Sequence, residues 1–456
     1  MKASMLDRAR AFTGDRLLRR VVRNSTYLFA SNVISAVLTI VTAGLLGVKE
    51  FGVLGIITNF VSNVNRLLSF RMGDVVVKYM GESLAQNTPE GKTRAAAVVK
   101  AAGMVEAATS LAAFAALAVL AQWGATYNAK DASLTPLFLL FGVSILANIT
   151  TETATGVLQV TGHFRSQALI NLAQSVLVAL LVVLTALRGG GLLDVLLAYL
   201  AGKIILGLGP ILVALYWLEK TLGKGWLLTP LSGLPPWKEF IWFGINTNLS
   251  GTINVFARDS EVQWVGFFFG PEVSGFYKVA LALINLIVMP INPFISTTYP
   301  EITKAFAARQ WQRLRDLLGR VTIIAASWTV AVAVGILLFG QTLLFSNWTL
   351  FGRSFHLYRP EYAPAYPVLL VLMVGYGAAN ILFWNRPLLL AQGLASYALK
   401  VSFGAMLLKV ILVFVFLPWA GYLAEAWILS GYFVLSVGWM VWRGLRGIRT
   451  AQAAEG

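Results

Sequence analysis

The sequence predicts an all-α polytopic membrane protein with twelve transmembrane helices, arranged as two six-helix lobes related by a pseudo-twofold axis. Composition is the first reason, because 57% of the 456 residues are hydrophobic, only 12% are charged and the mean hydropathy is +0.72. A water-soluble globule of ordinary composition is far less apolar. The second reason is the number of apolar stretches that can cross a bilayer, and the third is a similarity between the two halves of the chain.

The apolar stretches reach the roughly 20 residues that a transmembrane helix needs, and several exceed it, which predicts tilted or protruding helices. The predicted spans are residues 24–46, 52–80, 96–122, 134–158, 166–187, 192–217, 240–268, 273–302, 317–345, 362–390, 398–417 and 421–442. The predicted domains are an interfacial amphipathic helix (1–23), an N-lobe of six spans (24–217), a cytoplasmic inter-lobe loop (218–239), a C-lobe of six spans (240–442) and a cytoplasmic tail (443–456).

Basic residues predict the orientation in the membrane. The net charge of +16 is compatible with nucleic-acid binding, but the Lys and Arg residues follow a membrane pattern instead. With the N-terminus in the cytoplasm, 24 of the 36 Lys and Arg residues lie in or beside cytoplasmic segments, and only five lie in outside loops. Cytoplasmic loops of membrane proteins carry this excess. We therefore expect a multi-pass protein of the cytoplasmic (inner) membrane, with both termini in the cytoplasm and no nucleic-acid partner.

The N-terminal segment and the rare residue types add further limits. Residues 1–23 carry seven Lys and Arg residues among apolar ones, which is typical of a helix on the membrane surface. The first span follows directly, so this segment is unlike a cleaved signal peptide. The chain has no cysteine and only two histidines, His163 and His356, which are far apart in sequence. Disulfides and thiolate sites are therefore excluded, and no metal site is expected.

Residues 240–270 are apolar enough to span a bilayer, yet their second half carries Arg258, Asp259 and Glu261. Each such charge opposes insertion by roughly 2.5 to 3.5 kcal/mol. On a continuous helix, the polar residues of this stretch form one stripe on an otherwise apolar surface. The members of the stripe are Thr247, Ser250, Asn254, Arg258 and Glu261. We expect this stripe to face a polar cavity between helices.

Two pairs of similar turns indicate an internal duplication. The Gly-x4-Gly turn at residues 47–52 matches the one at residues 270–275, at an offset of 223 residues. The exit of the fourth span, residues 156–162, resembles that of the tenth, residues 387–393, at an offset of 231. Because the offsets agree and each half has an even number of spans, we expect halves of like orientation related by a twofold axis along the membrane normal.

These turns are part of a wider resemblance. Together with Arg71-Met72-Gly73-Asp74, Arg258-Asp259, Gly270-Pro271-Glu272 and Gly275-Phe276-Tyr277-Lys278-Val279-Ala280, they resemble polysaccharide-type flippases. These flippases belong to the multidrug, oligosaccharidyl-lipid and polysaccharide exporter superfamily. The resemblance implies a transporter that moves a polyprenyl-pyrophosphate-linked oligosaccharide to the outer leaflet, for a surface polymer such as O-antigen or exopolysaccharide. The implied partners are this lipid-linked substrate, membrane lipids and polysaccharide-assembly proteins.

The substrate class predicts which residues bind it. A pyrophosphate needs cations, and a sugar head needs amide or hydroxyl groups, all facing one water-filled cavity. The second, seventh and eighth spans place such groups on shared faces, and the candidates are Arg66, Arg258, Lys278, Asn63, Asn254 and Asn285. Lys203, Arg386 and Lys409 either line the cavity or reach an interface by snorkelling. The alternative is that these groups pair with one another and hold helices together, and for Arg71, Asp74 and Lys78 we expect such a local ion cluster.

Buried carboxylates raise the question of energy coupling. A carboxylate that binds H⁺ or Na⁺ in one access state can make transport directional. The candidates are Glu106, Glu152, Asp259 and Glu261. Glu152 lies on a polar face that either coordinates a cation or only hydrogen-bonds to a neighbour. No organic cofactor is expected.

Two other function classes fit the sequence less well. A membrane-embedded polysaccharide polymerase or ligase needs a catalytic outside loop or a metal-carboxylate site, and neither is evident in this sequence, so we do not expect an enzyme. A multidrug or other lipid exporter of the same superfamily is the closer alternative. A drug exporter needs an acidic or apolar cavity for cationic drugs, which the excess of cations in the spans disfavours. The usual fourteen spans of peptidoglycan-precursor flippases argue against that branch.

Overall fold

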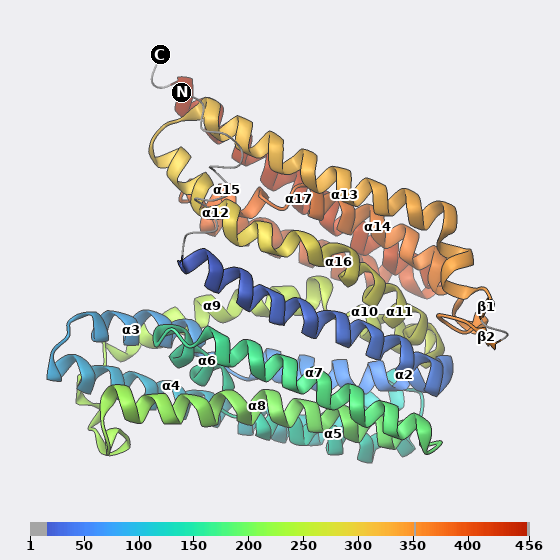
Figure 1. Ribbon diagram of the computed structural model, residues 1–456, viewed down its shortest axis with the longest axis horizontal. Coiled ribbons are helices and arrows are strands. Elements are labelled where there is room, and N and C mark those ends of the chain that lie inside the picture. The colour runs from blue at the N-terminus through green and yellow to red at the C-terminus, as the bar shows by residue number, and fades with distance from the viewer. Residues whose placement is uncertain (1–15, 351–352, 454–456) are drawn as a thin grey trace. The chain divides into compact units, whose positions relative to one another are not determined.

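The computed structural model describes residues 16–350 and 353–453, and this part of the chain is almost entirely helical (Figure 1). The first helices are α2 (Arg16–Leu68), α3 (Gly73–Ala85), α4 (Pro89–Trp123), α5 (Thr135–Ala147), α6 (Thr151–Val160), α7 (Phe164–Leu187) and α8 (Leu192–Leu222). The later ones are α9 (Trp237–Arg258), α10 (Glu261–Phe269), α11 (Pro271–Val288), α12 (Asn292–Ala307), α13 (Trp311–Phe345), α14 (Ala365–Ile381), α15 (Asn385–Ala391), α16 (Ala395–Ala420) and α17 (Leu423–Ala453). Strands β1 (Trp348–Leu350) and β2 (Arg353–Phe355) form one antiparallel hairpin. Most of the predicted interfacial helix, residues 1–15, lies outside the described residues.

Ten of the described helical segments are long and apolar enough to cross a membrane, so the prediction of a helical multi-pass membrane protein is confirmed. The count differs from twelve at two places. First, α2 joins the predicted span 24–46 to the first part of the span 52–80 at Gly47, whose backbone leaves the helical conformation (φ 72°, ψ 176°). The span 52–80 is itself interrupted, because α2 ends at Leu68 and α3 begins at Gly73. Second, the predicted span 240–268 is divided into α9 and α10, which are not among the ten segments. The arrangement of twelve helices in two lobes stays a prediction.

Internal contacts divide the chain into two compact units, each built from separate segments. Unit 1 comprises Met1–Leu38, Val64–Ala118 and Leu139–Asn248, and unit 2 comprises Thr39–Asn63, Val119–Phe138 and Leu249–Gly456. The boundaries fall inside α2, α4, α5 and α9, so these helices contribute to both units.

Unit 1 has an apolar core formed by α3, α4, α6, α8 and the start of α9. Its fully buried members include Met72, Val75, Val76, Ala102, Val157 and Phe240. Helices α3 and α6 approach closely at Gly156, where a Cβ atom would clash with the carbonyl oxygen of Gly73. A buried hydroxyl pair, Ser31 and Ser175 at 2.7 Å, joins α2 to α7, and α7 lies beside α8 (Figure 1). Small residues and hydroxyls at helix contacts are typical of membrane proteins, where close backbone approach replaces the hydrophobic effect.

In unit 2, α14 and α17 pack along each other, and α16 also packs against α17. At Gly375 a Cβ atom would clash with the backbone of Ser430, and the Ser430 hydroxyl donates to the carbonyl of Val371 at 2.7 Å. The phenol of Tyr277 on α11 donates to the carbonyl of Tyr422 at 2.5 Å and accepts from the backbone N–H of Ala426 at 2.9 Å. These contacts hold the first turn of α17, which carries a residue of the candidate site.

The two Gly-x4-Gly turns contact each other within unit 2. Gly47 and Gly270 share an uncommon backbone conformation, with φ/ψ of 72°/176° and 88°/−175°, which glycine adopts without strain. A Cβ atom at Gly52 would clash with the carbonyl of Pro271, and one at Gly275 would clash with that of Val48. Adding 223 to 48 and 52 gives 271 and 275, so the two contacts are reciprocal. Reciprocal contacts are what a twofold axis between duplicated segments requires.

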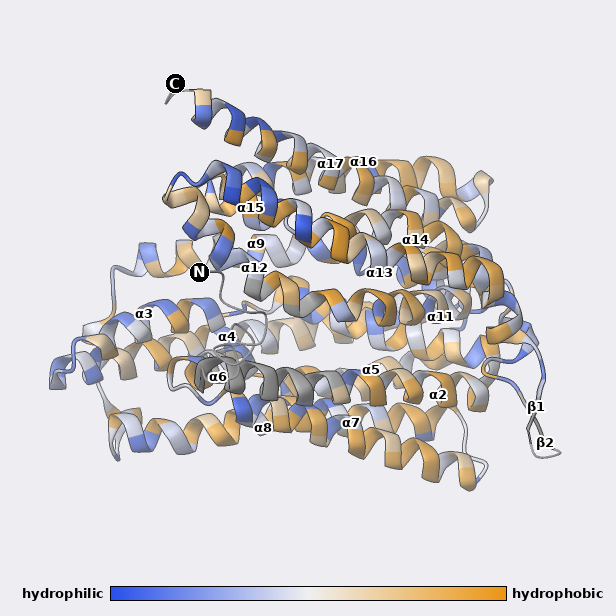
Figure 2. Cartoon of the chain, turned by 45° about the horizontal axis from the view of Figure 1, so that its top comes forward, coloured by the Kyte–Doolittle hydropathy of each residue, from blue (hydrophilic) through white to orange (hydrophobic). Residues whose placement is uncertain are grey.

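Large apolar side chains cover much of the surface, as lipid contact requires. Examples that are more than half exposed are Val119, Leu187, Leu212, Ile323, Phe339 and Trp419. Figure 2 shows hydrophobic residues along the lengths of α7, α8 and α16, and hydrophilic residues gathered toward helix ends and loops.

Candidate functional site

The first element of the candidate site is a break in the predicted seventh span. The expectation of one continuous helix is wrong here, because α9 ends at Arg258 and α10 begins at Glu261. The hydroxyl of Ser260 donates to the carbonyl of Val255 at 2.6 Å and so competes with helical hydrogen bonding. Asn63, from α2, donates to the carbonyl of Asp259 at 3.3 Å and to the Ser260 hydroxyl at 3.4 Å.

Consequently, the predicted polar stripe does not continue to Glu261. Asn63, which was predicted to contact substrate, is 9% exposed and hydrogen-bonds to the broken backbone. A broken helix at membrane depth is tolerated where protein groups satisfy its free backbone atoms or where it lines a polar cavity. Both conditions are met at this break, because Lys409 donates to the carbonyl of Ala257, and Arg258 and Asp259 line a polar cavity.

The second feature is a buried cluster of three charges, which we call the ionic triad: Glu261, Lys409 and Glu425. The Lys409 ammonium lies 2.7 Å from Glu261 Oε1 and 3.1 Å from Glu425 Oε1, and it donates to the carbonyl of Ala257 at 3.0 Å. The side chains are each at most 1% exposed. With all three ionised, the triad has a charge of −1, and an uncompensated buried charge is costly.

The third feature is a polar cavity of about 510 Å³ within unit 2. It brings together four of the predicted residues, Asn254, Arg258, Asp259 and Asn285. The guanidinium of Arg258 lies 4.0 Å from the Asp259 carboxylate, and the two side chains are 48% and 28% exposed. The break after Arg258 thus turns a cation and an anion toward one cavity at the end of α9.

Further cavity residues come from the break between α14 and α15. Arg386, one of the residues weighed from the sequence, lines the cavity together with Asn380 and Asn385, which sequence reasoning missed. Asn380 donates to the Thr329 hydroxyl at 2.9 Å, and Asn385 donates to the carbonyl of Leu382 at 2.7 Å. The signal that the sequence offers for them is the presence of two asparagines within a six-residue stretch of one apolar span. Tyr376, Ser402, Tyr432 and Ser436 complete the polar part of the lining.

Two predicted substrate residues lie elsewhere. Lys278 is not among the residues lining the cavity, and its ammonium lies 4.3 Å from the centre of the Phe51 ring within unit 2. Arg66 is exposed on α2 in unit 1, within electrostatic range of Lys203 on α8. Only Arg258 of the three predicted pyrophosphate cations therefore lines the described cavity.

Unit 1 has its own polar centre, at the break between α5 and α6. The buried Glu106 carboxylate accepts from the backbone N–H groups of Glu152 and Thr153, both at 2.8 Å, and from the Thr153 hydroxyl at 2.6 Å. The anion thereby satisfies free donors at the N-terminus of α6. Glu152 itself pairs with Arg71, whose Nη2 atom lies 2.6 Å from the Oε1 atom of Glu152.

This pairing corrects a prediction. Arg71 was expected to form a local cluster with Asp74 and Lys78, but it reaches across to Glu152 on α6 instead. The backbone of Arg71 also exchanges hydrogen bonds of 2.9 and 3.1 Å with the side chain of Asn248, in the gap between α2 and α3. The predicted coupling residue Glu152 thus has a cation of its own.

Comparison with known proteins places the chain in a family. A family model described as "Polysaccharide biosynthesis protein" matches residues 19–306, more than half of the chain. Among curated proteins, the teichuronic acid biosynthesis protein TuaB of Bacillus subtilis (strain 168) is 24% identical over 249 residues, 54% of this chain and 47% of TuaB. The match thus spans about half of that relative. The inner membrane protein YghQ of Escherichia coli (strain K12) is 22% identical over 349 residues, 72% of this chain and 93% of YghQ.

Solved structures show the same fold. The lipid II flippase MurJ in an inward closed conformation has a TM-score of 0.71 at 13% identity, with 94% of this chain and 89% of that chain covered. An inward-facing multidrug resistance MATE family transporter of the MOP superfamily has a TM-score of 0.69 at 15% identity, with coverage of 93% and 96%. The resemblance seen in the sequence is therefore confirmed: this chain belongs to the polysaccharide biosynthesis protein family and has the fold of MOP-superfamily transporters.

Proposed function

We propose that this protein is a flippase of the cytoplasmic membrane that moves a polyprenyl-pyrophosphate-linked oligosaccharide to the outer leaflet for a surface polysaccharide. The observation that carries the proposal is the composition of the polar cavity. Two arginines, Arg258 and Arg386, and one carboxylate, Asp259, line it, so its formal charge is +1. A net positive cavity favours a pyrophosphate and disfavours the cationic compounds that many drug exporters carry.

The rest of the cavity lining suits a sugar. Four asparagines line the cavity, Asn254, Asn285, Asn380 and Asn385. A side-chain amide offers both donors and an acceptor, which matches hydroxyl groups of either role. The volume of about 510 Å³ falls within the range of about 300 to 1,000 Å³ for small-ligand pockets. A cavity of this size encloses the polar head while the lipid tail stays in apolar surroundings.

Transport in this proposal proceeds by alternating access. Two six-helix lobes rock relative to each other, and the cavity opens to one side of the membrane at a time. The helix breaks beside the cavity are suited to this motion, because residues at element ends absorb changes of φ and ψ. Chemistry on the substrate is not required for this cycle, so the protein acts as a transporter and not as an enzyme.

The coupling ion, H⁺ or Na⁺, is proposed to act at Glu261 and Asp259, with Glu152 as a further candidate. The ionic triad has one negative charge in excess, and one monovalent cation neutralises it. Asp259 competes with the substrate for Arg258, so neutralising Asp259 releases the guanidinium to bind pyrophosphate. A proteoliposome assay with imposed pH or Na⁺ gradients distinguishes the two ions.

The decisive variant is Arg258→Ala in a strain that depends on this chain for its surface polysaccharide. We expect a loss of transport of about 10- to 100-fold, as for the removal of one charge-assisted hydrogen-bonding partner of a phosphate. Lipid-linked oligosaccharide should accumulate on the cytoplasmic leaflet and surface polymer should disappear, while the amount of protein in the membrane stays the same.

Two matched variants serve as controls. Arg258→Lys keeps the charge but loses the planar fork, and it should retain partial activity. Arg359→Ala removes a cation from the segment between α13 and α14, outside the cavity, and should behave as wild type. Wild-type transport by Arg258→Ala contradicts the proposal. Normal polymer combined with raised drug sensitivity in a strain that lacks the chain favours the multidrug exporter instead.

A further inference from the structure

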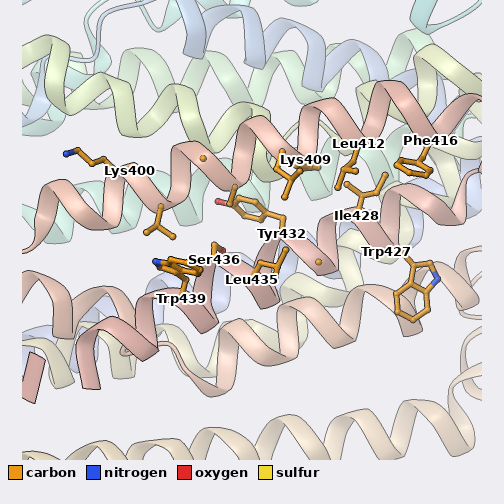
Figure 3. A pocket seen from close by; sticks show the side chains of 15 residues that line it. Lys400, Lys409, Leu412, Phe416, Trp427, Ile428, Tyr432, Leu435, Ser436 and Trp439 are labelled. Atoms are coloured by element: carbon orange, nitrogen blue, oxygen red, sulfur yellow. The ribbon is translucent and has the colours of Figure 1, made fainter. Parts of the chain in front are cut away.

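The second large cavity of unit 2 is an apolar groove of about 700 Å³ between α16 and α17, which we call the α16–α17 groove. Aromatic and aliphatic side chains project into it from both helices, with Phe416 and Trp427 toward one end and Lys400 and Trp439 toward the other (Figure 3). At a rise of about 1.5 Å per residue, Lys400 and Phe416 lie roughly 24 Å apart along α16. The groove therefore follows most of the roughly 30 Å hydrocarbon core of a bilayer.

Glycines make the groove open. A Cβ atom added at Gly404 on α16 or at Gly431 on α17 would meet no protein atom within 4 Å. Lys409 also lines the groove, although its ammonium is held by Glu261 and Glu425, so only its aliphatic stem is available as apolar surface. The walls thus offer an elongated apolar slot with gaps beside the two glycines, and such a shape suits a chain with methyl branches.

Charge distinguishes the two ends of the groove. Lys400 lies at one end, and Arg443 and Arg446 follow Trp439 along α17, one and nearly two turns beyond it. Glu425 is the one acidic residue between positions 395 and 453, and it belongs to the ionic triad. An occupant with an anionic group at the Lys400 end is therefore favoured, and on the predicted topology this end is cytoplasmic.

The groove also adjoins the polar cavity. Tyr432 and Ser436, one turn apart on α17, line both spaces. Ser402 on α16 lines the polar cavity, and Val401, Gly404 and Ala405 line the groove. The seam between α16 and α17 therefore separates an apolar slot from an amide- and arginine-lined cavity by one layer of side chains. A single amphiphile with a long apolar chain and a polar anionic head matches this pair of spaces.

We infer that the α16–α17 groove binds the isoprenoid chain of the lipid-linked substrate while its head occupies the polar cavity. This inference rests on the proposed function and names the site of the tail. The seam between the helices is then the lateral entrance through which the head passes from the membrane. Ordinary phospholipid and a neighbouring protein helix are the other occupants that an experiment must separate from it.

The test uses the full chain in lipid nanodiscs and a polyprenyl pyrophosphate that carries a photoreactive diazirine on its isoprenoid chain. After irradiation, mass spectrometry should locate adducts on residues 395–439. The variant Gly404→Leu/Gly431→Leu adds bulk at two residues that line the groove, and at each of them an added Cβ atom meets no protein atom within 4 Å. The yield of adducts should fall at least about tenfold. This is the loss of probe affinity expected when about two methylene groups of the isoprenoid chain lose their contacts.

The matched control is Gly438→Leu, the same change on α17 at a site that is also free of neighbours and does not line the groove. This variant should be labelled to the same extent as the wild type.

Three outcomes overturn the inference. The filled variant is labelled as strongly as the wild type, or excess phosphatidylglycerol displaces the probe as well as unlabelled polyprenyl pyrophosphate does. In the third, the wild type is a dimer and the filled variant is a monomer, so that a second copy of the chain occupies the groove. Transport separates the two claims. If the filled variant transports normally while Arg258→Ala does not, the groove does not bind the tail, but the proposed flippase function is retained. If the wild type is labelled in the groove but moves no lipid-linked oligosaccharide, the groove binds an isoprenoid chain, but the proposed flippase function is contradicted.

Discussion

The polar centres of the two units solve one problem in different ways. In unit 1, the break before α6 is stabilised by Glu106, whose carboxylate receives three hydrogen bonds from Glu152 and Thr153. In unit 2, the break before α10 is stabilised by Asn63, and the first residue of α10, Glu261, joins a buried ammonium and a second carboxylate. One buried anion is matched by uncharged donors, whereas two buried anions share a single cation.

This contrast bears on where the proposed coupling ion would act. Hydrogen bonds satisfy Glu106 locally, so its centre is a structural anchor for α6. The ionic triad cannot be neutral with all its members ionised, and its balance depends on three helices, α10, α16 and α17. Relative movement of these helices changes the energy of the triad directly, which is the property that a transport cycle can use.

The largest effect is expected from Lys409→Met. Removing the ammonium leaves two carboxylates buried without a cation, and breaking a buried ion pair in this way costs about 3 to 5 kcal/mol. Thermal unfolding in detergent should show a large loss of Tm, or the protein should fail to accumulate in the membrane. The triple variant Lys409→Met/Glu261→Gln/Glu425→Gln removes all three charges and should recover much of the lost Tm. Equal instability of both variants contradicts the charge argument and indicates a packing effect.

A smaller effect is expected in unit 1 from Glu106→Gln. The amide keeps one acceptor oxygen but replaces the charged acceptor of three hydrogen bonds, for which a loss of about 1.5 to 3 kcal/mol is typical. Unfolding followed by the same thermal assay should give a moderate decrease of Tm. Thr153→Val provides the comparison, since it removes only one donor to the same carboxylate. If Glu106→Gln leaves Tm unchanged, the carboxylate is not the anchor of α6.

The smallest effect is expected at the Arg71–Glu152 pair. Its side chains are 41% and 38% exposed, and pairs with that access to solvent contribute about 0 to 1 kcal/mol. Arg71→Ala should therefore leave Tm almost unchanged, and so should Glu152→Gln. If Glu152→Gln nevertheless abolishes gradient-driven transport in proteoliposomes, Glu152 acts in coupling; if transport persists, the pair is only a surface contact.

Several parts of the fold were predictable because they depend on local or periodic properties. Hydropathy identified the membrane-spanning segments, since length and apolar content alone decide whether a helix can cross a bilayer. Gly47 and Gly270 were recognisable as turns because a backbone with φ near 80° favours glycine. Arg258, Asn254 and Asn285 were predicted from a spacing that places them on polar helix faces, and they line one cavity. Their role in binding substrate stays a prediction.

Other features depend on partners that are distant in sequence. Helical spacing predicted that Glu261 continues the stripe of Arg258, but Ser260 and Asn63 stabilise a break between them. Glu425 was missed because its role comes from Lys409, which lies close only after α16 and α17 pack. Arg71 has an acidic neighbour at a favourable helical spacing, yet it pairs with Glu152, 81 residues away.

Composition and residue spacing alone indicate a multi-pass helical membrane protein with two similar glycine turns and with charges in its spans. These properties follow from each residue's cost of leaving water and from backbone sterics, both of which act locally. Helix packing, in contrast, sets which charges meet in the ionic triad, which residues line the polar cavity, and where a groove remains open between α16 and α17. Those outcomes depend on how separate helices pack, because a buried charge is stabilised by whichever partner the packing brings within a few ångströms.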